Sequence, residues 1–199
     1  METLIPTKEE VTNICKKMMA GNGYHPLFLN ILVSAINKYT TIKTIVEIGV
    51  DRGESAFAIL KAIPDAKYYG YDYWGKGEPE WKKFGLGKWL LDYPYHKEMA
   101  EKLLQHFDAT LTHINSQDLK EIPMADLIHV DADHSLAGCL SDLNLVYKFL
   151  NPKGVIIVHD ACHPAVKKAV MLWHEQHKEF QMDVFEYSTH WILIWRKEK

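Results

Sequence analysis

The sequence predicts an α/β fold in three layers: a seven-stranded, mostly parallel sheet with one antiparallel edge strand and helices on both faces. Short apolar segments alternate with segments of helical spacing along the chain, which is typical of parallel strands joined by helical crossovers. The apolar segments are β-branched and continuous, as expected for strands buried on both faces. The last two follow each other closely, which favours a closing antiparallel pair.

Length and composition limit the class of protein. The chain has 199 residues, of which 47% are hydrophobic, and a formal net charge of −3. A chain of this size buries a proper core, so we expect a single domain over residues 1–199. The weak negative charge gives no bulk attraction to nucleic acid or to anionic membranes. With no signal-like start, no long apolar run and three widely spaced cysteines, we expect a cytoplasmic protein that is not bound to membranes.

The elements of the first half follow from local pattern. Apolar residues at helical spacing predict N-terminal helices within residues 1–40. The β-branched run "KTIVEIG", residues 43–49, predicts a buried strand, and "KYYGYD", residues 67–72, predicts a second one. Between them, residues 56–63 repeat apolar positions at helical spacing and Pro64 follows the end of that helix.

Residues 73–95 interrupt this alternation, because they hold aromatic residues and glycines with weak periodicity. We interpret them as a lid over the substrate; packing of an irregular segment or a dimer contact is the alternative. Beyond them, helical spacing predicts a helix over 96–107, a long helix near 136–150 and a last helix that begins at Pro164. The remaining predicted strands are 109–114, 125–130, 155–160, 182–187 and 190–196, the last two joined by a tight turn at Ser188–Thr189.

Two glycines and two acids mark the turn after the first strand. Gly49 permits a sharp turn and Gly53 a close approach of the following helix. Where a dinucleotide motif needs its middle glycine, this chain has Asp51, which together with Glu47 repels phosphates. We therefore expect a cationic nucleoside without phosphates, S-adenosylmethionine. Asp72 ends the second strand, where a carboxylate can accept both hydrogen bonds of a ribose diol.

Two segments resemble a known family. "VEIGVDRGESA" looks like the first motif of the class I S-adenosylmethionine-dependent methyltransferases. "HVDADHSLAGCLSDLNLVYKFLNPKGVIIVHDA" resembles, more closely, a bacterial branch of the metal-dependent O-methyltransferases that is similar to the catechol and caffeoyl-CoA enzymes. The resemblance runs from about residue 27 to about residue 175 and implies a Rossmann-like methyltransferase fold. It also implies methyl transfer from S-adenosylmethionine to a hydroxyl of a small molecule.

The resemblance also assigns roles to residues that match the family's motifs. Glu47, Gly49 and Gly53 would form the turn beside the methionine portion of the cofactor, with Ser55 near its carboxylate. Asp72 would bind the ribose. The stretch "NSQDL" resembles the family's adenine-binding segment. The other implied cofactor residues are Ser116 and Gln117, which would flank the adenine, and Asp131 at the end of the fourth strand.

A divalent metal, Mg²⁺ or Mn²⁺, is the second implied cofactor. Asp131 and Asp160, each ending a strand, match the first two metal-ligand positions, and oxygen ligands of this kind favour those ions. His134 falls where catechol-type enzymes have a catalytic lysine, so it would be the general base. Ala161 stands where the family has an asparagine as third ligand. A third ligand is then open among Asp133, His134, His159 and His163.

Other interpretations of these residues stay open at this point. A metal-dependent hydrolase would use Asp131, Asp133, His134 and Asp160 but would leave the Glu47 turn unused. A non-catalytic nucleoside-binding module would explain Ala161. Asp131 and Asp160 would, in the plainest interpretation, cap the helices that follow them. The acceptor and the oligomeric state do not follow from the sequence, and a homo-oligomer stays open.

Overall fold

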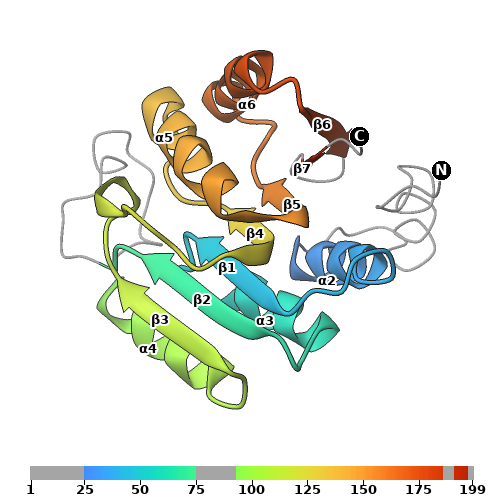
Figure 1. Ribbon diagram of the computed structural model, residues 1–199. Coiled ribbons are helices and arrows are strands. Elements are labelled where there is room, and N and C mark those ends of the chain that lie inside the picture. Colours follow the sequence, from blue (N-terminus) through green and yellow to red (C-terminus); the bar gives the residue numbers. More distant parts are fainter. Residues whose placement is uncertain (1–24, 75–92, 186–190, 197–199) are drawn as a thin grey trace.

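The computed structural model describes residues 25–74, 93–185 and 191–196 (Figure 1). In these ranges seven strands form one sheet in the order β3-β2-β1-β4-β5-β7-β6. Five strands run parallel from β3 to β5, while β7 pairs antiparallel with both β5 and β6. The strands are β1 (Thr44–Ile48), β2 (Lys67–Asp72), β3 (Ala109–His113), β4 (Ala125–Val130), β5 (Leu150–Val158), β6 (Phe180–Phe185) and β7 (Trp191–Arg196).

The predicted fold class is confirmed, with one refinement. The antiparallel strand β7 lies one place in from the edge, and β6 forms the edge itself. The strand order reverses between β1 and β4, since the chain winds outward from β1 to β3 and then crosses back to β4. Open α/β sheets bind their ligands beyond the carboxyl ends of the strands at such a reversal.

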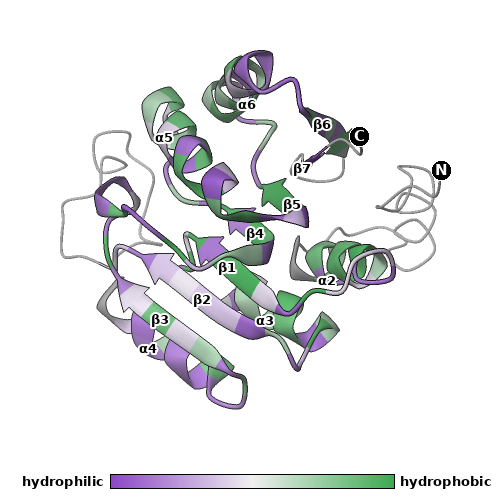
Figure 2. Cartoon of the chain, viewed as in Figure 1, coloured by the Kyte–Doolittle hydropathy of each residue, from purple (hydrophilic) through white to green (hydrophobic). Residues whose placement is uncertain are grey.

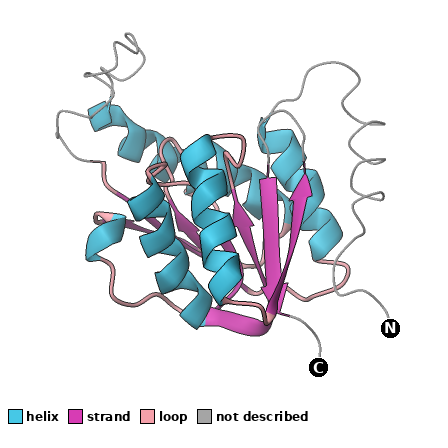
Figure 3. Ribbon diagram, turned by 90° about the horizontal axis from the view of Figure 1, so that it is seen from above, coloured by secondary structure: helices cyan, strands magenta, loops and turns pink. Residues whose placement is uncertain are grey.

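Helices cover both faces of the sheet (Figure 3). Residues of α2, α3 and α4 pack with alternate residues of the strands in one core, and residues of α5 and α6 pack in the other. The helix α2 is mainly hydrophobic in Figure 2, in keeping with its burial in the first core. The helices are α2 (His25–Ile36), α3 (Glu54–Ala62), α4 (Tyr93–Leu104), α5 (Leu136–Val146) and α6 (Pro164–Gln176), with 3₁₀ turns at Ser116–Asp118 and Tyr147–Phe149.

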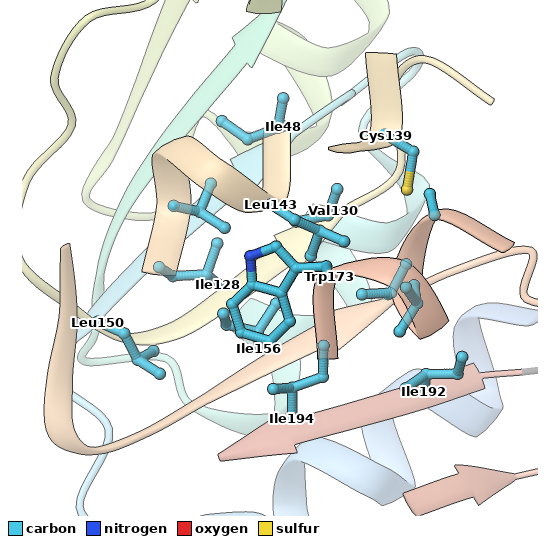
Figure 4. Close-up of a cluster of buried hydrophobic side chains, with 14 of the residues drawn as sticks. Ile48, Ile128, Val130, Cys139, Leu143, Leu150, Ile156, Trp173, Ile192 and Ile194 are labelled. Atoms are coloured by element: carbon cyan, nitrogen blue, oxygen red, sulfur yellow. The ribbon is translucent and has the colours of Figure 1, made fainter. Parts of the chain in front are cut away.

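The second core is organised around Trp173 of α6. Its side chain is 1% exposed and lies among aliphatic side chains from the strands and from α5 (Figure 4). An indole buries more apolar surface than an aliphatic side chain, so this one residue ties α6 to the sheet. The neighbours labelled in the figure include Ile128, Val130, Leu143, Ile156 and Ile194.

The end of the long helix differs from the sequence prediction. The α-helix ends at Val146, a 3₁₀ turn follows, and β5 begins at Leu150 rather than after the "NPKG" turn. Leu150 is buried and pairs with Ala125, and the register then shifts before Leu127 pairs with Val155. Burial of Leu150 draws the chain into the sheet early, and the irregular pairing absorbs the extra residues.

Some predicted features lie outside the described residues. These are the part of the N-terminal helices before residue 25, residues 75–92 of the predicted lid, and the turn at Ser188–Thr189. Among the helices that are described, none has the length and apolar content to cross a membrane.

Candidate functional site

A pocket of about 630 Å³ opens at the carboxyl ends of the parallel strands. This volume is in the range of small-molecule and cofactor sites. Its walls come from the turn after β1, the ends of β2, β4 and β5, and the loop after β3. The lining residues are Gly49, Val50, Asp51, Arg52, Glu54, Ser55, Tyr71, Asp72, Tyr73, Asn115, Ser116, Asp131, Ala132, Asp133, His134, His159 and Asp160.

The turn after β1 needs both of its glycines. Gly49 has φ +91° and Gly53 has φ +83°, backbone angles that other residues rarely adopt. A Cβ on Gly49 would lie 2.1 Å from the carbonyl oxygen of Asp131. The turn therefore packs directly on the end of β4, which brings the two walls of the pocket together.

Asp72 holds this turn in place. Its Oδ2 accepts hydrogen bonds from the backbone amides of Val50 (2.7 Å) and Asp51 (2.8 Å). Burial raises the pKa of Asp72 above its ordinary value, and the two amides oppose that rise. One carboxylate oxygen is thus engaged by the chain, and the residue still lines the pocket.

Asp51 connects the turn to α4. It adopts φ +48°, and its Oδ1 lies 2.5 Å from Nδ1 of His96. Its carbonyl oxygen accepts a hydrogen bond of 2.8 Å from the indole of Trp74. A non-glycine residue in this conformation is strained, and its contacts on both sides maintain it. Asp51, whose negative charge disfavours phosphates, thus also positions the wall of the pocket.

Two aspartates and two histidines meet on the opposite wall. Nε2 of His134 lies 3.4 Å from Asp131 Oδ1 and 3.3 Å from Asp160 Oδ2. Nδ1 of His159 lies 2.9 Å from Asp131 Oδ1. Asp131, His134 and Asp160 offer ligand atoms that all lie within 4.8 Å of one another. The prediction that these three residues share one site is therefore supported by their geometry.

The residues of this cluster shift one another's pKa values. Burial by itself would raise the pKa of Asp131, but hydrogen bonds from His134 and His159 outweigh it and hold that pKa well below its usual range. The hydrogen bond to Asp131 raises the pKa of His134, against the opposing effect of burial. The aspartate is ionised at neutral pH, and the imidazole beside it is a strengthened proton acceptor.

The aspartates do not cap helices in this structure. Ser135 caps α5, since its Oγ accepts the amide of Gly138 at 3.0 Å, and Asp133 supports that turn through the amide of Ser135. The cap position of α6 is His163, whose side chain makes no capping bond. Asp160 has φ +52°, a strained conformation of the kind that clusters at functional sites. The plainest interpretation of Asp131 and Asp160 is therefore wrong.

Comparisons with known proteins place this chain in a family. The family model described as "Methyltransferase domain" matches residues 46–161, more than half of the chain. The chain belongs to this methyltransferase domain family. The prediction of a class I S-adenosylmethionine-dependent methyltransferase is confirmed. No curated protein matches the sequence.

Solved structures share the methyltransferase fold at low sequence identity. The SAH-bound methyltransferase PaMTH1 from Podospora anserina aligns with a TM-score of 0.64 at 15% identity, covering 100% of both chains. The O-methyltransferase from Bacillus cereus, in complex with SAH, aligns at 0.63 and 15% identity, covering 98% of this chain and 94% of that one. The O-methyltransferase TomG from Streptomyces achromogenes, in complex with SAM, aligns at 0.62 and 14%, covering 98% and 92%.

Glu47 of the methyltransferase is placed differently from the expectation that it contacts the cofactor. Its side chain is 0% exposed and does not line the pocket. Its carboxylate accepts the hydroxyls of Ser55 (2.5 Å) and Tyr68, and Nδ1 of His129 lies 2.6 Å away. Glu47 is thus the centre of a buried polar cluster that lies outside the pocket lining.

Only part of the predicted adenine segment lines the pocket. Ser116 lines the pocket. Gln117 does not, because its side-chain amide contacts Asp142 Oδ1 (3.3 Å) and Ser116 Oγ (3.2 Å). Asn115 caps the 3₁₀ turn by accepting the amide of Gln117. The segment is therefore held rigidly beside the pocket by contacts with α5.

The structure brings most of the predicted residues together. Glu47, Gly53 and Gln117 support the pocket from outside its lining. His159, one of the open candidates for a third ligand, lines the pocket and contacts Asp131 as well as Trp191. The available signal was a histidine at the end of a continuous apolar run, directly before an acid. The predicted residues in the lining are Gly49, Ser55, Asp72, Ser116, Asp131, His134 and Asp160.

Proposed function

We propose that this protein transfers a methyl group from S-adenosylmethionine to a hydroxyl of a small molecule, with a divalent metal ion bound by Asp131 and Asp160. One observation carries the proposal. The glycine turn with Asp72 and the acid–histidine cluster face each other across one pocket at the reversal of strand order. Methyl transfer needs this arrangement, because donor and acceptor must be held in line.

The cofactor half of the site follows from what each residue can offer. The turn at Gly49 approaches the methionine portion through its backbone. Asp72 gives Oδ2 to the turn, so Oδ1 is the oxygen that accepts from the ribose. Ser116 in the lining, with Gln117 behind it, flanks the adenine.

The acceptor half fits a divalent cation. Nε2 of His134 lies between two carboxylates, 3.4 Å from Asp131 Oδ1 and 3.3 Å from Asp160 Oδ2, and the ligand atoms of the three residues lie within 4.8 Å of one another. The carboxylate oxygens of Asp131 and Asp160 are a donor set suited to such an ion, with His134 beside them. A bound cation supplies Lewis-acid polarisation of the acceptor hydroxyl. His134, the proposed general base, then takes the hydroxyl proton.

Isothermal titration with S-adenosylhomocysteine, after chelation and with or without Mg²⁺ or Mn²⁺, tests the donor site. We expect micromolar binding in either condition, and methyl transfer to a panel of hydroxyl acceptors that falls after chelation. Absence of binding in every condition would refute the proposal. Binding with no metal effect and no turnover would favour the non-catalytic nucleoside-binding module.

The variant Asp72→Ala tests the ribose contact. Because this variant loses a hydrogen bond between a charged group and the ribose, we expect its affinity for S-adenosylhomocysteine to fall by roughly 10-fold or more. Asp65→Ala is the matched control, because Asp65 is an exposed acid just beyond α3. Unchanged affinity in Asp72→Ala would remove Asp72 from the binding site. Hydrolysis of test esters without added cofactor would favour the hydrolase interpretation.

A further inference from the structure

Given the proposed methyl-donor site, we infer that His96 of α4 is a positioning residue for the ribose. It holds Asp51 in a left-handed backbone conformation, and Asp51 in turn aligns Asp72 with the ligand. His96 is 6% exposed and is absent from the pocket lining, whereas Asp51 and Asp72 both belong to it. Any effect of His96 on the ligand therefore passes through another residue.

A small buried cluster fixes α4 against the glycine turn. Val50 of the turn, Trp74 and Ala100 of α4 are buried and pack together. The turn and the helix approach closely, because a Cβ on Gly53 would lie 3.1 Å from atoms of Ala100. Ala100 lies one helical turn after His96, so both residues face the glycine turn. The place of His96 beside the turn is thus set by packing.

Asp51 is held at three points. Its amide donates to Asp72 Oδ2 (2.8 Å), its carbonyl oxygen accepts from the indole of Trp74 (2.8 Å), and its Oδ1 lies 2.5 Å from Nδ1 of His96. Arg52 lies 3.6 Å from the other carboxylate oxygen with 40% of its side chain exposed, whereas only 7% of the His96 side chain is exposed. An ion pair in contact with water contributes little, so His96 is the contact that fixes the Asp51 side chain.

The backbone of Asp51 needs this support. Its φ of +48° lies in the left-handed region, which costs free energy for a residue with a side chain. The two flanks of the turn cannot move, because Gly49 packs against the end of β4 and Gly53 against α4. If φ relaxed, the rigid peptide plane between Val50 and Asp51 would therefore have to rotate. This plane carries the Asp51 amide, and its rotation would remove that donor from Asp72.

The orientation of Asp72 depends on that amide. The amides of Val50 (2.7 Å) and Asp51 (2.8 Å) engage Oδ2, which leaves Oδ1 for the ribose in the proposed site. With one amide gone, the carboxylate is less restricted in its rotation, and the ribose no longer meets an oxygen at a fixed place. His96 thus contributes to donor affinity without touching the donor.

Isothermal titration with S-adenosylhomocysteine tests this series of contacts. We expect His96→Ala to weaken binding by roughly 3- to 10-fold, the effect of one hydrogen bond. The matched control is His106→Ala, an exposed histidine just beyond α4, which should change the affinity by less than about twofold.

A dideoxy analogue of S-adenosylhomocysteine, which lacks both ribose hydroxyls, shows whether the effect reaches the ribose. The loss of affinity in His96→Ala should be clearly smaller for this analogue than for S-adenosylhomocysteine. Equal losses for the two ligands would show that His96 does not act through the ribose contact, and would overturn the inference.

Two substitutions of Asp51 test the backbone role. Alanine keeps the strain and loses the contact with His96, whereas glycine adopts a positive φ freely. Asp51→Gly should therefore bind S-adenosylhomocysteine at least about 3-fold more tightly than Asp51→Ala. Adding His96→Ala to Asp51→Gly should cause no further loss. Equal affinities of Asp51→Gly and Asp51→Ala would contradict the inference.

Thermal unfolding checks that each variant is folded, and the wild-type protein separates the two levels of the proposal. If the wild-type protein bound no S-adenosylhomocysteine, the proposed function would fail. If it bound this ligand and His96→Ala bound it equally tightly, the positioning role of His96 alone would be wrong.

Discussion

The close approach of the glycine turn to β4 predicts a large effect of Gly49→Ala. The new Cβ would lie 2.1 Å from the carbonyl oxygen of Asp131, 2.5 Å from its carbonyl carbon and 2.8 Å from the amide nitrogen of Ala132. All three are backbone atoms, so no side-chain rotation relieves the overlap, and the two walls must separate by more than 1 Å to reach ordinary contact. The positive φ adds a penalty of its own.

The expected loss of unfolding free energy for Gly49→Ala is about 2–5 kcal/mol, from about 1–2 kcal/mol for the backbone angle and about 1–3 kcal/mol for overpacking. Urea unfolding followed by tryptophan fluorescence measures it. The control is Gly53→Ala, which has a similar φ of +83° but whose Cβ would lie 3.1 Å from atoms of Ala100; it should cost about 1–2 kcal/mol. Titration of Gly49→Ala with S-adenosylhomocysteine should also show weaker binding. Equal stability losses in the two variants would refute the role of the close approach.

Three further predictions concern stability. Burial raises the pKa of Asp142 to about 6, above its unfolded value, so the free energy of unfolding should fall by up to roughly 3 kcal/mol as pH rises from about 4 to about 6. Asp142→Asn should abolish this fall in urea titrations. If the pH profiles of the variant and the wild-type protein ran parallel, the prediction would be contradicted. Trp173→Ala should cost about 3–5 kcal/mol in urea unfolding, because it empties the centre of the second core, and a loss under 1 kcal/mol would show that this core collapses onto the space. Asp126→Ala should lower the melting temperature and cost roughly 2–3 kcal/mol, since Asp126 accepts the amides of Lys43 and Thr44 and the side chain of Asn151; unchanged melting would mean that water replaces these bonds.

Much of the fold was predictable because each strand carries its own signal. The strands at 67–72 and 125–130 have the predicted bounds, because the apolar and aromatic run in the sequence marks where each strand begins and ends. The end of the long helix was not predictable, because burial of Leu150 against a distant strand decides it. Helical periodicity alone continues through that residue.

The candidate site was predictable in its members but not in their directions. Glycines and acids at strand ends predict that a pocket lies there, because the parallel topology gathers those ends at one edge of the sheet. Nothing local predicts that Glu47 faces away from the pocket or that Gln117 faces Asp142. Those directions depend on neighbours from strands far away in the sequence, such as His129 beside Glu47.

The reversal of strand order also has a consequence for synthesis of the chain. The glycine turn follows β1, yet the strand that closes the pocket beside it is β4, and the acid after β5 comes only at residue 160. A nascent chain that has released its first 110 residues holds the turn and Asp72 but no opposite wall. Loop closure over such a separation delays these contacts. The methyl donor can therefore assist only the last steps of folding, and it stabilises the completed sheet rather than any fragment of it.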